Sequence, residues 1–220
     1  SSPPCSNIIF LLYFTEVSGS LSIMSLFEMI GVITFAAAGA YQAMQKHMDL
    51  FGVYILAITT AVGGGIIRDV VMDRGTPLFF SNNIVLITAL ISATIIILLR
   101  KQFQMNAFII MLDAIGLGAF SVDAGIKAID ASYTFSGFIF VSLMTGIGGG
   151  ILKDLLSGEL PAVLHKDVYA VAALVGVVFL WFASPLIGLQ LGGYCAITLV
   201  VLIRMYCYFR NINLPIIKIK

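Results

Sequence analysis

Long apolar segments separated by short polar turns run through most of the 220-residue chain. A helix needs about 20 apolar residues to cross the hydrocarbon core of a bilayer. Seven segments come close to that length, and helix-breaking residues, such as those of the turn at 73–77 (DRGTP), lie between them. The expected membrane spans are 27–45, 50–72, 83–99, 108–129, 133–156, 168–183 and 187–208. The pattern predicts an all-α integral membrane protein with seven transmembrane helices.

The composition excludes several classes of function. Hydrophobic residues make up 60% of the sequence and charged residues only 10%, whereas soluble proteins carry about 25% charged residues. The net charge of +1 offers no basic surface for nucleic acid. The three cysteines lack C-x-x-C spacing, and the sequence shows no nucleotide-binding loop and no catalytic or metal-ligating set. We therefore expect neither enzyme activity nor a cofactor.

A motif that occurs twice divides the chain into repeats. Residues 60–69 (TAVGGGIIRD) return 85 positions later as residues 145–154 (TGIGGGILKD). The same spacing aligns Glu28 with Asp113, and the similarity continues without gaps over about 27–72. Because each repeat holds three spans, an odd number, the second copy must enter the membrane upside down. The expected organisation is one transmembrane domain at 25–208, made of repeat one (27–100), repeat two (108–184) and a seventh helix (187–208).

The basic residues in the loops and near the ends of the spans predict the orientation in the membrane. Cytoplasmic loops carry the excess of Lys and Arg. One side of the predicted topology collects Lys46, Arg100, Lys101, Lys166, Arg210, Lys218 and Lys220, and the other chiefly Arg74 and Lys127. We therefore expect a protein of the cell inner (plasma) membrane with a cytoplasmic basic tail at 209–220 and the N-terminus outside. Residues 1–24 are interpreted as a leader or tag-like segment, with an interfacial helix as the alternative.

The glycine triplets sit inside the second and fifth spans. A glycine costs about 1 kcal/mol relative to alanine in a helix interior, so three in a row predict a kink or a short unwound segment. The kinks would form at Gly63, Gly64, Gly65, Gly148, Gly149 and Gly150. Backbone carbonyls freed there could hold a monovalent cation, near Thr60, Gly63, Thr145 and Gly148. The alternative is that the glycines only allow tight packing of the two helices.

Charged residues follow each triplet within about one helical turn. They are Arg68, Asp69, Lys153 and Asp154. Charges inside a membrane are costly unless they are paired or hydrated, and they commonly mark an ion pathway. We therefore expect these four side chains to be polar pore or gate residues. In the alternative, Arg68 and Lys153 extend to the membrane interface and the two aspartates cap helix ends.

Two further pairs of charges lie in the apolar spans. Asp123 and Lys127 are four residues apart on one helix face, so we expect them to pair and to belong to the pore or gate. Glu28 and Asp113 occupy equivalent places near the starts of the first and fourth spans. We interpret them as carboxylates that are stabilised at helix N-termini.

The doubled GGG-x-x-[RK]-D motif within a three-plus-three-plus-one layout resembles the trimeric intracellular cation (TRIC) channels, in their prokaryotic branch. The resemblance covers about residues 25–208 and implies seven transmembrane helices and a homotrimer with one pore in each protomer. It also implies conduction of monovalent cations, potassium above all, with potassium or sodium as the permeant species. The pore would run between the second and fifth helices, which the glycines bend, with Arg68, Lys153, Asp69 and Asp154 as its polar residues.

Two other functions stay open at this stage. Bacterial relatives of these channels have been labelled glycine transporters, so a secondary transporter of a small zwitterion such as glycine is the main alternative. In that case helix ends would hold the carboxylate and Asp123 the amine. A third possibility is a membrane protein without transport activity, whose glycines serve only helix packing or trimer assembly.

Overall fold

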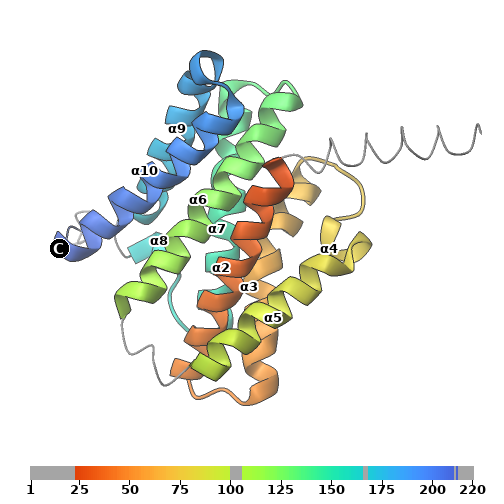
Figure 1. Cartoon of the computed structure of the whole chain (residues 1–220), viewed down its shortest axis with the longest axis vertical. Helices are drawn as coiled ribbons and strands as arrows, with labels where there is room; N and C mark the ends of the chain where they lie inside the picture. The colour runs from red at the N-terminus through yellow and green to blue at the C-terminus, as the bar shows by residue number, and fades with distance from the viewer. Residues whose placement is uncertain (1–22, 100–105, 166–167, 211, 213–220) are drawn as a thin grey trace, which may run out of the picture.

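The computed structural model describes residues 23–99, 106–165, 168–210 and 212, and within these ranges the chain is helical apart from short connections. Figure 1 shows the helices in order along the chain. Their bounds are α2 Ile23–Gln45, α3 Leu50–Val71, α4 Leu78–Ser81, α5 Asn83–Leu99, α6 Asn106–Asp130, α7 Phe135–Leu156, α8 Ala162–His165, α9 Tyr169–Ile187 and α10 Leu189–Arg210. Most of the expected 1–24 segment and of the expected basic tail lies outside the described residues.

The long helices confirm a protein that crosses the membrane several times. Within the described residues, α2, α3, α6, α7, α9 and α10 are each long and apolar enough to span a bilayer. Helix α5 is also apolar, but at 17 residues it is shorter than these six. The all-helical membrane fold is therefore confirmed, and the count of seven spans stays a prediction.

Two short helices lie in the connections between the expected spans, where the sequence pattern predicted no helix. Helix α4 follows Pro77 and helix α8 follows Pro161, and each is four residues long. Proline favours this position because its fixed φ suits the start of a helix. The two short helices occupy equivalent places after the glycine-containing helices, so they belong to the repeated unit.

Backbone geometry repeats with the same spacing as the sequence. His47 and Ser132, 85 residues apart, are each the second residue after a helix, α2 or α6, and each has a φ of 57°. Asp73 and Gly158, at the same spacing, follow α3 and α7 with φ of 51° and 73°. Figure 1 shows α2 and α6 running in opposite directions, as an inverted second copy requires.

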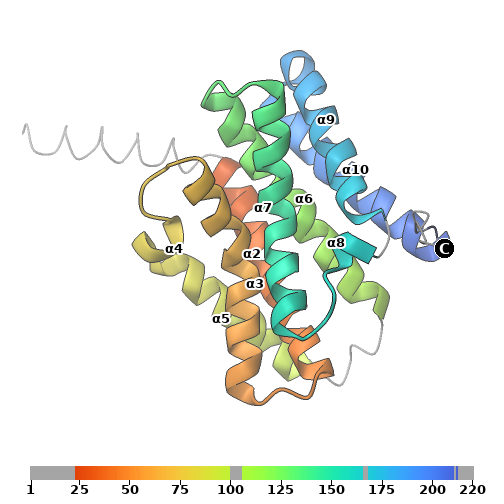
Figure 2. The same ribbon diagram turned by 180° about the vertical axis from the view of Figure 1, so that it is seen from behind.

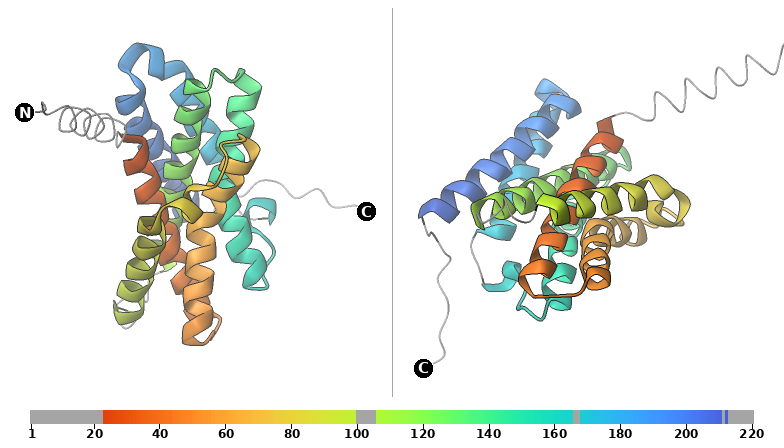
Figure 3. Two further views of the ribbon diagram at one scale, coloured as in Figure 1. Left: turned by 90° about the vertical axis from the view of Figure 1, so that its right-hand side faces the viewer. Right: turned by 60° about the horizontal axis from the view of Figure 1, so that its bottom comes forward.

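The helices are arranged around two central contacts. Helix α2 packs on α6, and α3 packs on α7 behind them, as Figure 2 shows from the rear. The pair α9–α10 lies on one side of this group and α4–α5 on the other (Figure 1). Figure 3 shows that the long helices run roughly along one direction. Helix α10, which has no partner in the repeat, packs on both α6 and α9.

The α2–α6 contact is reciprocal. Phe35 and Phe120, which are equivalent in the two repeats, lie with ring centroids 5.3 Å apart. Each ring covers a glycine on the opposite helix: a Cβ on Gly116 would lie 2.3 Å from Phe35, and one on Gly31 would lie 2.8 Å from Phe120. Both rings are buried, so this pair fixes how closely the two repeats approach.

Candidate functional site

The central glycine of each triplet brings the α3 and α7 backbones into contact. A Cβ built on Gly64 would lie 2.3 Å from the carbonyl oxygen of Thr145. The equivalent Cβ on Gly149 would lie 2.5 Å from the carbonyl oxygen of Thr60. Neither position has room for any side chain, because real Cβ contacts are essentially never below 3.0 Å. The two glycines therefore allow a backbone-to-backbone contact that no other residue would permit.

The expected unwound segments are not found. Helix α3 continues through Gly63–Gly65 and helix α7 through Gly148–Gly150 without a break. The energetic reason is that an unsatisfied backbone group in an apolar environment costs several kcal/mol, whereas glycine lowers helix stability by only about 1 kcal/mol per residue. The alternative of tight helix packing agrees with this geometry, and a bend at the glycines stays a prediction.

The first and third glycines of each triplet have different surroundings. A Cβ on Gly63 would lie 2.5 Å from Leu152, and one on Gly148 would lie 2.6 Å from Ile67, so side chains of the opposite helix fill these places. By contrast, the nearest atom to a Cβ on Gly65 is a Glu28 carboxylate oxygen at 3.7 Å. The third glycine of the first triplet therefore faces a polar group and has free space.

Five buried charged residues from three helices form what we call the Arg68 cluster: Glu28 of α2, Arg68 and Asp69 of α3, and Asp123 and Lys127 of α6. Arg68 is only 2% exposed and donates to all three carboxylates. The distances are 2.9 Å from Nη2 to Glu28 Oε1, 2.5 Å from Nη1 to Asp123 Oδ2, and 2.8 Å from Nε to Asp69 Oδ1. The alternative in which Arg68 extends to the membrane interface is therefore wrong.

Lys127 completes this cluster. Its Nζ lies 2.8 Å from Asp123 Oδ2 and 2.9 Å from Glu28 Oε2. The predicted pairing of Asp123 with Lys127 is therefore confirmed, and Glu28 bridges the two basic groups. Removing one partner from such a buried network leaves an uncompensated charge, which costs about 3–5 kcal/mol.

A second buried group, which we call the Lys153 cluster, contains Asp113, Lys153, Asp154 and Arg204. Lys153 Nζ lies 2.9 Å from Asp113 Oδ1, and Arg204 Nη2 lies 3.3 Å from Asp113 Oδ2. The Arg204 guanidinium also lies 4.2 Å from the centroid of the Tyr169 ring, a distance at which a cation and an aromatic face attract each other. Lys153, like Arg68, is buried and paired, so it does not extend to the interface either.

Glu28 and Asp113 have equivalent roles that differ from the expected one. Each pairs with the basic residue of its own repeat 40 positions later, Glu28 with Arg68 and Asp113 with Lys153. Neither α2 nor α6 has an acidic residue in its first turn. Their interpretation as carboxylates at helix N-termini is therefore wrong, because the two helices begin earlier in the chain than the pattern indicated.

The two motif aspartates hold the loops that follow α3 and α7. Asp69 Oδ2 accepts a hydrogen bond of 3.1 Å from the Leu78 backbone N–H, at the start of α4. Asp154 Oδ2 accepts one of 2.8 Å from the Ala162 backbone N–H, at the start of α8. The aspartates therefore bind the start of the next short helix, and not the end of their own helix as the capping alternative had it.

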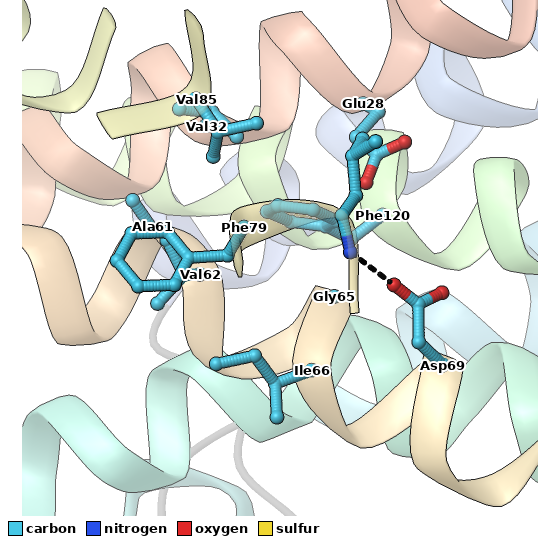
Figure 4. A pocket seen from close by; sticks show the side chains of 11 residues that line it. Glu28, Val32, Ala61, Val62, Gly65, Ile66, Asp69, Phe79, Val85 and Phe120 are labelled. Carbon is cyan, nitrogen blue, oxygen red and sulfur yellow. Dashed lines mark hydrogen bonds between the residues drawn. The ribbon is translucent and has the colours of Figure 1, made fainter. Parts of the chain in front are cut away.

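The cavities beside the two clusters differ greatly in volume. A cavity of about 340 Å³ opens on the Lys153 cluster. Its polar lining includes Gln42, Gln45, Asp113, Lys153, Asp154, Glu159 and Arg204. Beside the Arg68 cluster the corresponding volume is about 10 Å³, which is room for about one water molecule. Figure 4 shows this small cavity with the Glu28 and Asp69 carboxylates at one end and apolar side chains such as Val32 and Val62 at the other.

The candidate pore and gate residues therefore fall into two groups. Arg68, Asp69, Asp123 and Lys127 lie together, and Lys153 lies apart from them with Asp154. Sequence reasoning missed Arg204 and Tyr169, which complete the second group. Arg204 could have been noticed, because an arginine inside an otherwise apolar span indicates a buried pair or a polar pathway. Nothing in the sequence pattern distinguishes Tyr169 from an interfacial tyrosine.

Comparison with known proteins agrees with this architecture. The model of a family described as glycine transporter matches residues 25–101 and 110–185. The chain is 36% identical to the UPF0126 membrane protein YvgT of Bacillus subtilis, over 86% of this chain and 94% of YvgT. It is 32% identical to the UPF0126 inner membrane protein YadS of Escherichia coli K12, over 86% of this chain and 93% of YadS.

Solved structures give the closer functional comparison. The fold matches the TRIC trimeric intracellular cation channel orthologue from Rhodobacter sphaeroides with a TM-score of 0.81 and 28% identity, over 87% of this chain and all of that one. A structure that explains conductance through TRIC cation channels matches with a TM-score of 0.79 and 30% identity, over 90% of this chain and 98% of that one. The chain therefore belongs to the family of prokaryotic TRIC channels, which the matching family model describes as glycine transporters.

Proposed function

We propose that this protein is a potassium-permeable cation channel with one pore in each protomer, lined by α3 and α7 and gated by their basic residues. The observation that carries the proposal is the pair of buried charge clusters on either side of the glycine contact. Helices α3 and α7 run in opposite directions (Figure 2), so Arg68 and Lys153 lie beyond that contact at opposite ends. Charged residues inside membrane-spanning segments are costly even when they are paired, and they commonly mark an ion pathway.

In this structure one end of the proposed pathway would be open and the other closed. The cavity of about 340 Å³ brings water as far as Lys153. On the other side, Arg68 is buried and held by three carboxylates, and the cavity beside its cluster has room for only about one water molecule. We therefore assign the main closure to Arg68, and a secondary role to Lys153 as a positive charge in the wall of an already open vestibule.

Opening would require α3 and α7 to separate or bend at the glycines. The carbonyl oxygens of Thr60 and Thr145 are covered by Gly149 and Gly64 in the closed contact. Separation would expose these oxygens, and the proposed cation site at Thr60, Gly63, Thr145 and Gly148 would form only then. Potassium or sodium would be the ion that meets them, since carbonyl oxygens can replace the hydration shell of a monovalent cation.

For the assembly we propose a homotrimer in the inner membrane, in contact with membrane lipid. The supporting comparison is the Rhodobacter sphaeroides orthologue, which is described as trimeric, together with the E. coli relative, which is described as an inner membrane protein. Each protomer would cross the membrane seven times as an inverted three-plus-three repeat with α10 added. Its C-terminus would be cytoplasmic and its N-terminus outside.

A secondary transporter of glycine is the second candidate, and the description of the matching family model favours it. The cavity beside Lys153 contains both basic and acidic side chains, as a zwitterion would require. A channel and a transporter differ in kinetics, because transport saturates with substrate and needs a coupling gradient.

The gate assignment is tested by potassium efflux from liposomes that contain wild-type protein, Arg68→Ala or Lys153→Ala. Arg68→Ala should increase the efflux rate more than Lys153→Ala does, because Lys153 lines a wide cavity whereas the space beside the Arg68 cluster is nearly closed. Arg74→Ala is the matched control, since Arg74 is an exposed basic residue outside both charge clusters. Equal efflux from wild-type protein and both pore variants would contradict gating by the basic residues. Labelled glycine uptake, measured in parallel, separates the two candidate functions.

A further inference from the structure

Asp123 has one carboxylate oxygen that the charge network does not use. Arg68 and Lys127 both bind Oδ2. Oδ1 is buried and has no hydrogen-bond partner among the described residues, and Asp123 as a whole is 0% exposed. A buried carboxylate oxygen without a donor is costly, because burial removes water and nothing replaces it.

The charges of the Arg68 cluster do not balance. Glu28, Asp69 and Asp123 are acidic, whereas only Arg68 and Lys127 are basic, so full ionisation leaves one excess negative charge. The Lys153 cluster has no such excess, since Asp113 and Asp154 face Lys153 and Arg204. The imbalance is therefore specific to the cluster in which the unused oxygen occurs.

We propose that Asp123 Oδ1 is a proton-binding site and that a proton there favours release of Arg68, so that acid opens the channel. This inference rests on the proposed channel function and on Arg68 as its closure. A proton suits the site better than a metal ion does, because the cavity beside the cluster has room for about one water molecule. Glu28 lines that cavity and shares Lys127 with Asp123, so the buried carboxylate is linked to the cavity through one bridging ammonium group.

The direction of the effect follows from the charges. With Arg68 in place the ionised cluster has one excess negative charge, and after Arg68 leaves it has two. The open gate therefore binds a proton more tightly than the closed gate, and by reciprocity a bound proton favours the open gate. For one coupled proton, the ratio of open to closed channels changes by at most about tenfold per pH unit.

The charged groups that face Asp123 come from α2, α3 and α6. Helix α2 contributes Glu28 and α3 contributes Arg68 and Asp69, while Lys127 comes from α6 itself. The buried charges of α7 and α10, and the Tyr169 ring of α9, belong to the Lys153 cluster. The proton site is thus defined by the Arg68 cluster alone.

The test records single channels of the full chain in planar bilayers, with the same pH on both sides. The pH is lowered from about 8 to about 5, a range in which exposed carboxylates stay ionised. Both histidines, His47 and His165, are replaced by glutamine in every variant, because histidine also titrates in this range. Open probability should rise as the pH falls, with a dependence on one proton.

Two variants and a control make the test specific. Asp123→Asn keeps the size of the side chain and balances the charges of the cluster, so open probability should be high and independent of pH. Glu28→Gln removes the same excess charge and should also flatten the pH dependence. Asp130→Asn is the control, because Asp130 is an exposed residue of the same helix, and it should keep the wild-type pH dependence.

Infrared difference spectroscopy gives a readout that does not need current. The wild-type protein should show the carbonyl band of a buried neutral carboxylic acid on acidification, and Asp123→Asn should lose it. Channels that open equally at every pH, or an infrared band that survives in Asp123→Asn, would overturn the proton site. Opening that follows potassium concentration without any such band would also overturn it, in favour of a potassium site. An intact band without current would instead contradict the channel function.

Discussion

The role of the glycine triplets leads to a sharp prediction, because neighbouring glycines have opposite surroundings. In Gly64→Ala the new methyl group would lie 2.3 Å from the Thr145 carbonyl oxygen. In Gly65→Ala the nearest atom would be a Glu28 oxygen at 3.7 Å, an ordinary van der Waals contact. If the glycines serve the α3–α7 contact, the first change must damage the protein and the second must not.

The size of the effect follows from the geometry. The helices would have to move apart by roughly 1 Å before the Gly64→Ala contact became an ordinary one. Overpacking of this kind costs about 1–3 kcal/mol, and here the obstacle is backbone on both sides. Gly65→Ala instead gains up to about 1 kcal/mol of helix stability. For a domain of this size, 1 kcal/mol corresponds to about 2–4 °C in melting temperature.

The assay is thermal unfolding of purified protein in detergent, with potassium efflux from liposomes measured on the same preparations. Gly64→Ala should melt several degrees below the wild-type protein, and Gly149→Ala should behave in the same way because its contact is the symmetric one. Gly65→Ala should melt at or above the wild-type temperature. Equal destabilisation by Gly64→Ala and Gly65→Ala would refute the packing argument and favour a general need for helix flexibility.

Three further predictions concern the charged residues. A double-mutant cycle with Glu28→Gln and Arg68→Met should give a coupling free energy of about 0.5–3 kcal/mol in thermal unfolding; additive effects would contradict the buried pair. Asp69→Ala removes both the partner of the Leu78 N–H and one carboxylate that binds the buried Arg68. It should therefore cost about 3–5 kcal/mol and speed proteolysis near residues 72–77, whereas the exposed Arg74→Ala should do neither. Lys46→Ala breaks an exposed ion pair with Glu159 and should lower the free energy of unfolding by at most about 1 kcal/mol, an effect that added salt removes. A larger loss of stability would contradict the assignment of this pair as a weak surface contact.

The fold could be predicted largely because apolar length and internal similarity are local properties of the sequence. The expected second span, 50–72, ends within one residue of α3, and the fifth, 133–156, ends with α7 at Leu156. Helices α4 and α8 were missed because four residues carry no periodic pattern. Their positions depend on side chains of the preceding helices, Asp69 and Asp154, that reach across the turn.

The candidate site could be predicted only where its contacts were local. The pair Asp123–Lys127 spans one helical turn, so the spacing in the sequence was sufficient to predict the contact. Arg68 and Asp123 are 55 residues apart, and their contact depends on how α3 packs beside α6. The unwound segments expected at the glycine triplets are absent for a related reason. Helix propensity describes an isolated helix, whereas in the folded chain the backbone of the neighbouring helix packs into the space beside the central glycines.

Ion selectivity is the most direct test of whether the protein is a potassium-permeable channel. Purified wild-type protein in a planar bilayer is recorded under a potassium chloride gradient, and labelled glycine uptake is measured in liposomes from the same preparation. A potassium-permeable channel should give a current whose reversal potential lies near the equilibrium potential of potassium, without glycine uptake. Saturable, gradient-driven glycine uptake without such a current would contradict it.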